Sequence, residues 1–197
     1  MSAVVLLIAS LALAWLARPR TGWSGEQAAL FCSGLVGSGA STWELLTLAV
    51  PALSSTEANY LLASLCQYAA FPLLLLVAAI QGLQKTGYTD AELLRWDRVI
   101  WGRILLVVCV IYVLMQRSHN LVLLDNAVIL LGCFAAIVWL IAASKGNAKR
   151  INVVFAITFL SLTASYFTQL LPMQWLIPLS FASTWGMIYP QSLSTLK

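Results

Sequence analysis

The sequence predicts an all-α protein, a polytopic bundle of transmembrane helices that forms a single domain over residues 1–197. Hydrophobic residues make up 61% of the chain and charged residues only 9%, whereas a soluble domain carries about 25% charged residues. The mean hydropathy is +0.89, and apolar residues occur over nearly the whole length. We therefore expect almost all of the chain to lie within a lipid bilayer.

Seven stretches are long and apolar enough for a membrane-spanning helix, which needs about 20 mainly apolar residues. The predicted spans are 2–17, 28–50, 58–82, 99–116, 120–143, 151–170 and 173–193. No basic residue precedes the first stretch, and Arg18 and Arg20 follow it, so we expect an uncleaved helix rather than a signal peptide. Between the third and fourth spans, Thr89 and Glu92 have the spacing of a capping box and predict a helix start.

The basic residues predict how the chain crosses the bilayer. Of the 11 Lys and Arg residues, all except Arg117 fall at one side of a seven-span bundle. Because cytoplasmic loops are rich in Lys and Arg, the N-terminus is expected outside and the C-terminus in the cytoplasm, in the plasma (cytoplasmic) membrane. The same bias accounts for the net charge of +4, and we expect no nucleic-acid partner.

The sequence lacks the spacing typical of enzymes, metal sites and cofactor sites. Each of the four cysteines (Cys32, Cys66, Cys109 and Cys133) stands alone in an apolar segment, and His119 is the only histidine. Zinc sites and disulfide frameworks need grouped ligands or paired cysteines. Nucleophile-elbow, zinc-helix, phosphate-loop and dinucleotide patterns are absent as well. We therefore expect no catalytic residues, no metal and no cofactor.

Polar residues within the predicted spans are the candidates for a functional site, because an ionisable group in lipid is costly unless it faces protein or water. The candidates are Glu44, Asp125 and Arg103, together with Gln67, Tyr68 and Gln169. Arg103 is close enough to the basic end of its span to extend to the interface, or to bind an anionic lipid head group. Asp125 follows Arg117 and His119 closely, so it can form a local ion pair or take part in proton or cation handling.

The stretch SGLVGSGASTWE, residues 33–44, predicts a site of close helix packing. Ser33, Gly37 and Ser41 recur every four residues and Glu44 follows three residues later, so all four share one helical face. Small residues at this spacing let two transmembrane helices approach closely. We expect a packing seam that ends in a buried Glu44. The alternative is one wall of a polar site in which Glu44 exchanges protons, and a local break at Gly37–Gly39 is left open.

Three functions are compatible with this sequence. The first is a non-catalytic subunit or accessory factor of a larger membrane complex, because the chain is small and its span-2 seam suits association with other membrane subunits. The alternative is a small proton- or cation-coupled transporter or channel that uses Glu44 and Asp125. The weaker alternative is an intramembrane enzyme acting on lipid, with Glu44, Asp125 and His119 as acid, base or metal ligands. Besides such subunits, the bilayer itself is the expected partner.

Overall fold

The structure is a computed structural model that describes residues 2–53, 55–87, 96–168 and 173–192. Its α-helices are α1 (Ser2–Leu16), α2 (Gly25–Ala49), α3 (Thr56–Leu65), α4 (Phe71–Thr86), α5 (Arg98–Arg117), α6 (Leu121–Ser144), α7 (Arg150–Thr168) and α8 (Met173–Ser192). The described residues also contain a 3₁₀ turn, η1 (Pro51–Leu53), and a π turn, η2 (Cys66–Ala70). They contain no strand. The predicted all-α class is confirmed, and the helices begin and end within a few residues of the predicted spans. The expected capping box at Thr89 and Glu92 lies outside the described residues.

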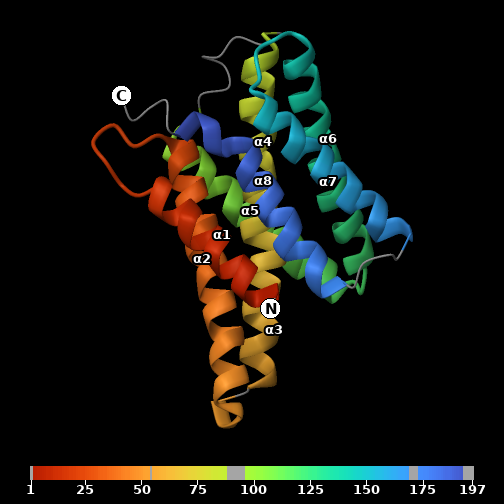
Figure 1. The fold of residues 1–197 in the computed structure, drawn as a ribbon. Helices are drawn as coiled ribbons and strands as arrows, with labels where there is room; N and C mark the ends of the chain where they lie inside the picture. The colour runs from red at the N-terminus through yellow and green to blue at the C-terminus, as the bar shows by residue number, and fades with distance from the viewer. Residues whose placement is uncertain (1, 54, 88–95, 169–172, 193–197) are drawn as a thin grey trace.

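Four helical segments of the described chain are long and apolar enough to cross a membrane. They are Glu57–Thr86, Arg98–Arg117, Leu121–Ser144 and Arg150–Thr168. The first is one continuous helix of 30 residues made of α3, η2 and α4 (Figure 1). Helix α1 is also apolar, but it has only 15 residues. These segments are consistent with an integral membrane protein.

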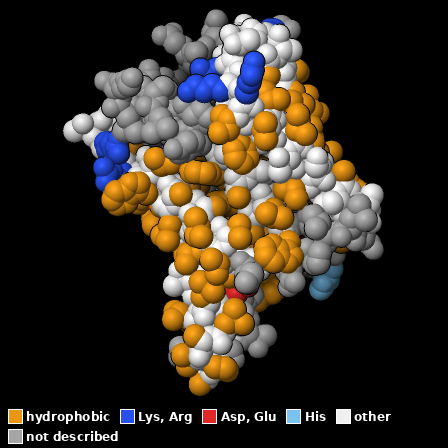
Figure 2. Space-filling model, in the orientation of Figure 1, with side chains coloured by type: hydrophobic (Ala, Val, Ile, Leu, Met, Phe, Trp, Pro, Cys, Tyr) orange, Lys and Arg blue, Asp and Glu red, His pale blue; other side chains and the backbone are white. Residues whose placement is uncertain are grey.

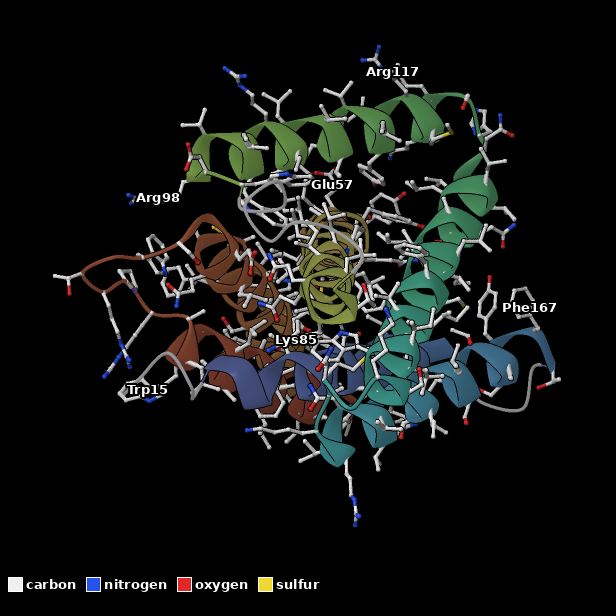
Figure 3. The ribbon with its side chains drawn as sticks, turned by 90° about the horizontal axis from the view of Figure 1, so that it is seen from above. Trp15, Glu57, Lys85, Arg98, Arg117 and Phe167 are labelled. Atoms are coloured by element: carbon white, nitrogen blue, oxygen red, sulfur yellow. The ribbon has the colours of Figure 1, made fainter. Side chains whose placement is uncertain are left out.

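Helix α4 forms the centre of the bundle, and Figure 3 shows it end-on with the other helices around it. Its residues 71–80 are apolar on every side, as expected of a helix surrounded by protein. Leu74, Leu75, Val77 and Ala78 are 0% exposed. The buried indole of Trp139 on α6 donates a hydrogen bond to the Ala78 carbonyl oxygen at 3.0 Å, which fixes α6 against this core.

Helices α1 and α2 pack closely because small residues line their contact. A Cβ atom on Gly34 would lie 2.7 Å from the backbone nitrogen of Ala14 and 2.8 Å from the carbonyl oxygen of Ser10, whereas ordinary contact begins at 3.4 Å. Gly37 also faces Ser10, and α2 runs without a break through Gly37 and Gly39. The two backbones can therefore approach this closely only because position 34 has no side chain.

Basic side chains gather at one end of the molecule, the upper end in Figure 2. There the turn between α6 and α7 is bonded to the end of α4. Lys145 Nζ donates to the Thr86 carbonyl oxygen at 2.8 Å, and Asn147 Nδ2 donates to the Lys85 carbonyl oxygen at 3.0 Å. At the opposite end, the hairpin of α2 and α3 extends beyond the other helices (Figure 1).

Helix α5 lies at the edge of the bundle, and Figure 3 shows it along one side between Arg98 and Arg117. Trp101 is the only buried residue of α5, which is described over its full length. The Trp101 ring packs against Gly25 at the start of α2. Nearer the other end, the rings of Tyr112 and Tyr68 stack with centroids 4.9 Å apart. Two aromatic contacts, together with the partly buried Ile104 and Leu105, therefore hold α5 against the bundle.

Candidate functional site

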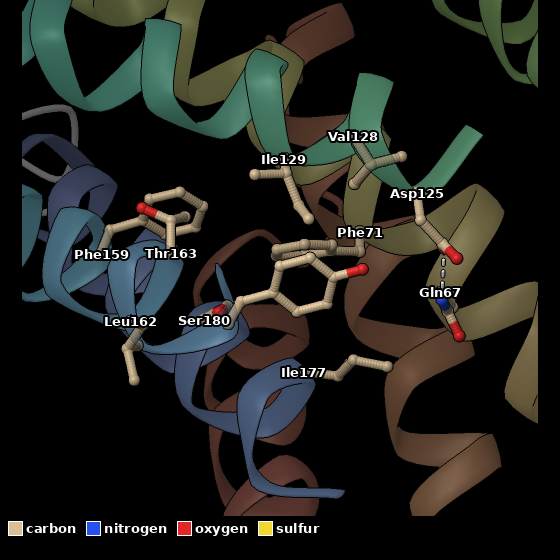
Figure 4. A pocket seen from close by; sticks show the side chains of 11 residues that line it. Gln67, Phe71, Asp125, Val128, Ile129, Phe159, Leu162, Thr163, Ile177 and Ser180 are labelled. Carbon is tan, nitrogen blue, oxygen red and sulfur yellow. Dashed lines mark hydrogen bonds between the residues drawn. The ribbon is translucent and has the colours of Figure 1, made fainter. Parts of the chain in front are cut away.

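A polar cluster joins the middle of the long α3–η2–α4 helix to α6. Gln67 Nε2 donates a hydrogen bond to Asp125 Oδ1 at 2.8 Å (Figure 4), and the neighbouring Tyr68 also interacts with the Asp125 side chain. Gln67 and Asp125 are half-buried and Tyr68 is buried. Three of the polar residues selected from the sequence therefore meet, although they belong to two helices far apart along the chain.

The cluster continues onto α5 through Tyr112, which the sequence analysis did not select. Tyr112 hydrogen-bonds with Ser64 and Tyr60, and Gln116 Nε2 donates to the Tyr60 hydroxyl oxygen at 3.5 Å. Tyr60, Ser64 and Gln67 follow a helical spacing and share one face, which was the only sequence signal for this surface. Nothing in the α5 sequence indicates that Tyr112 meets it.

The π turn η2 carries Gln67 and Tyr68 into this position. The backbone N–H of Phe71 bonds to the Cys66 carbonyl oxygen, a step of five residues instead of four. Pro72 has no N–H, so the carbonyl group of Tyr68 lacks the donor that an α-helix would provide. Single π turns inside α-helices occur frequently at functional sites. The local irregularity therefore coincides with the polar cluster.

Asp125 and Gln67 form the polar end of a cavity of about 320 Å³, which we call the central cavity. Its wall comes from η2, α4, α6, α7 and α8 (Figure 4). The apolar lining residues are Phe71, Val128, Ile129, Phe159, Leu162 and Ile177, and the other polar ones are Thr163, Tyr166 and Ser180. Small-molecule sites usually have volumes of about 300–1,000 Å³ and this mixture of apolar walls and a few polar groups.

Glu44 lies at a second cavity of about 370 Å³, which also has Gln67 and Ile177 in its lining. The two cavities are therefore neighbours that share these two residues. The Glu44 side chain is exposed, so the expectation of a buried carboxyl group at the end of the seam was wrong. The physical reason is that Glu44 faces this cavity, which Ser2 of α1 also lines, instead of packing against a neighbouring helix.

The other selected residues that the structure describes lie away from the polar cluster. Ser33, Gly37 and Ser41 are buried on α2; Ser41 Oγ donates to the Gly37 carbonyl oxygen at 2.7 Å, and Ser33 Oγ has no hydrogen-bond partner in the described chain. Arg103 is exposed on α5. Gln169 lies outside the described residues.

A second polar contact, which the sequence analysis missed, joins α2 and α4 near the basic end of the molecule. The Glu26 carboxylate accepts hydrogen bonds from Gln81 Nε2 at 3.1 Å and from Gln84 Nε2 at 3.2 Å. Gln81 is only 8% exposed. Because both donors come from one helix and the acceptor from another, this contact fixes the relative position of α2 and α4.

The described residues contain no group of three or more His, Cys, Asp or Glu side chains that could hold a metal ion. His119, the ligand considered from the sequence, lies exposed in the turn between α5 and α6, with a φ of 57°. The weaker alternative of a metal-dependent lipid enzyme therefore gains no support from the geometry.

The chain was also compared with known proteins. No protein-family model matches it, and no curated protein or solved structure is significantly similar to it. Inference about function therefore depends on the geometry described above.

Proposed function

We propose that this protein is a multi-pass protein of the plasma membrane that acts as a non-catalytic subunit or accessory factor of a larger membrane complex. The proposed topology has seven spans, with the N-terminus outside and the C-terminus in the cytoplasm. The gathering of Lys and Arg at the upper end in Figure 2 supports this orientation, because cytoplasmic ends are rich in basic residues.

The exposure of α5 is the observation that carries the proposal. We call its outward residues the α5 face: Leu106, Val107, Val110, Val113 and Leu114, which are 44–64% exposed. Helices in a membrane are held in place by packing and by interhelical hydrogen bonds, since lipid tails are as apolar as the side chains. Within the described part of the chain, Trp101 is the only fully buried residue of α5, and Ile104, Leu105 and Tyr112 supply its other core contacts. A partner helix on the α5 face would supply the missing packing.

Two features near the start of α5 favour a protein partner over lipid alone. A Cβ atom on Gly102 would have no atom of the described residues within 4 Å, so the described part of the chain does not require a small residue here. Small residues on outward faces allow a second helix to approach. The neighbouring Arg103 is exposed as well and can bond to polar groups of a partner at the interface. We therefore propose that the partner is another transmembrane helix.

Site-specific photocrosslinking in the native membrane tests this proposal. A photoreactive amino acid at Val110, which is 48% exposed, should give one protein adduct of constant mass. The matched control is the same amino acid at Leu130 on α6, which is 68% exposed and should give no such adduct. Gly102→Leu should remove the Val110 adduct and leave thermal stability unchanged, because position 102 has open space around it. The same adducts at both positions would contradict the proposal.

A small proton- or cation-coupled carrier is the second candidate, and the pair of adjacent cavities favours it. Each cavity has one carboxyl group, Asp125 in one and Glu44 in the other, and the side chain of Gln67 lines both. Carboxyl groups within membrane domains commonly mark ion or proton pathways. The π turn at Gln67 adds an interruption in the central helix, and interrupted helices often form the binding sites of transporters.

Proton flux into liposomes separates this candidate from the first. Purified protein with an entrapped pH-sensitive dye should acidify the interior when a potassium diffusion potential is applied. Glu44→Gln and Asp125→Asn should each lower the initial rate by about tenfold or more, as expected for loss of an essential proton carrier. Glu57→Gln, an exposed carboxyl group in the first turn of α3, is the matched control and should have the wild-type rate. Flux unaffected by the first two variants would exclude the carrier.

A further inference from the structure

We propose that the central cavity binds an amphiphile that has an apolar chain and a non-anionic head group able to donate hydrogen bonds, such as a long-chain alcohol or amine. This inference does not depend on the function proposed above, because a subunit and a carrier can both hold such a ligand.

The hydrogen-bonding pattern of the polar end defines the head group. Gln67 Nε2 donates one of its two hydrogens to Asp125 Oδ1, and the second stays available. The acceptors at this end are the Gln67 carbonyl oxygen and the remaining lone pairs of the Asp125 carboxyl group. Thr163 Oγ1 donates to the Leu160 carbonyl oxygen at 2.8 Å, so its hydroxyl hydrogen is already used. A ligand head that donates hydrogen bonds therefore matches this end.

The charge of the lining excludes an anionic head. Its described residues include one carboxyl group, that of Asp125, and no Lys, Arg or His. Burying an anion beside a carboxyl group without a cation is strongly unfavourable. The hydroxyl groups of Tyr166 and Ser180 can donate or accept, so they suit an alcohol or an amine but do not balance a negative charge.

The rest of the cavity fits an apolar chain. Phe71 and Val128 lie next to the polar end, and Phe159 and Leu162 lie farther from it (Figure 4). A ligand seated with its head at Asp125 would therefore extend along aromatic and aliphatic side chains. The volume of about 320 Å³ is at the lower end of the range for small-molecule sites, so one chain fits and a two-chain lipid does not.

Competitive photolabelling tests this inference on the purified full-length protein in phosphatidylcholine nanodiscs. The probe is a diazirine-bearing decanol, and the labelled peptides are mapped by mass spectrometry. Label should appear on peptides that contain Val128, Phe159 or Leu162. Decanol and decylamine should each reduce the labelling, whereas decanoate should compete at least about tenfold more weakly, because its head adds an unpaired negative charge.

Variants of one helix provide matched controls. Val128→Phe, at a position 9% exposed, should lower labelling about tenfold, because the larger side chain would fill the space that the probe occupies and weaken its binding. Leu130→Phe on the same helix is 68% exposed and should leave labelling unchanged. Asp125→Asn should keep competition by decanol and weaken that by decylamine, because the amide accepts hydrogen bonds but has no negative charge.

Two results would overturn the inference. Equal competition by decanol, decylamine and decanoate would show that these compounds partition non-specifically into the apolar part of the cavity. Label spread over exposed residues such as Leu130, with no excess at the cavity, would show labelling from the bilayer alone. Both readouts use the wild-type protein, so they hold even where a cavity variant fails to fold.

Discussion

Replacing Gly34 by alanine adds one methyl group at the closest contact between α1 and α2. The new Cβ atom would lie 2.7 Å from the Ala14 nitrogen, about 0.7 Å short of the 3.4 Å at which ordinary contact begins. The atoms that it meets first are backbone atoms of α1, which cannot rotate away as a flexible side chain can. The two helices must therefore separate, and overpacking of this kind costs about 1–3 kcal/mol.

The assay is the free energy of unfolding in mild detergent, and Gly39→Ala is its control. Gly39 belongs to the same helix, is exposed, and has open space where its Cβ would be. Alanine there gains helix propensity of about 0.8–1 kcal/mol without any clash. We expect Gly34→Ala to be destabilised and Gly39→Ala to be as stable as wild type or more so. Equal stability of the two variants would refute the close α1–α2 approach.

Three further predictions concern buried groups. Trp139→Phe removes the indole N–H that donates to the Ala78 carbonyl oxygen and should lower the unfolding free energy by about 1–2 kcal/mol; an unchanged value would show that the bond contributes nothing. Asn152→Ala removes the Nδ2 group that donates to the Met187 carbonyl oxygen, at a site 1% exposed, and should cost about 1–3 kcal/mol in the same assay; an unchanged value would show that this bond does not hold α8. Cys66 is 3% exposed, so its reaction with N-ethylmaleimide should be limited by local opening of the helix; rapid labelling of the folded protein would argue against its burial.

The helices were predictable from the sequence because each is a long apolar run bounded by charged or turn-forming residues. Those signals are local, and helix formation in an apolar solvent satisfies the backbone of each run independently. The π turn at Cys66–Ala70 was not predicted, although Pro72 lay within the run. A proline allows several local adjustments, and the neighbouring helices decide which one is adopted.

The polar site was only partly predictable. Gln67, Tyr68 and Asp125 were selected because polar groups in a bilayer need partners. These residues meet because of the way α6 packs against the central helix. No local sequence pattern predicts that packing. Glu44 shows the opposite case: its helical face was identified from the spacing, but its exposure was not, because exposure depends on how the neighbouring helices pack around it.

The unequal lengths of the helices affect the bilayer around the protein. With a rise of about 1.5 Å per residue, the 15 residues of α1 extend about 22 Å and the 30 residues of Glu57–Thr86 extend about 45 Å. The hydrocarbon layer is about 30 Å thick, so a bilayer around these helices cannot match both lengths at once. Mismatch of this kind has an energetic cost, which makes stability depend on acyl-chain length. Reconstitution into lipids of different acyl-chain length should therefore change the unfolding free energy of the protein.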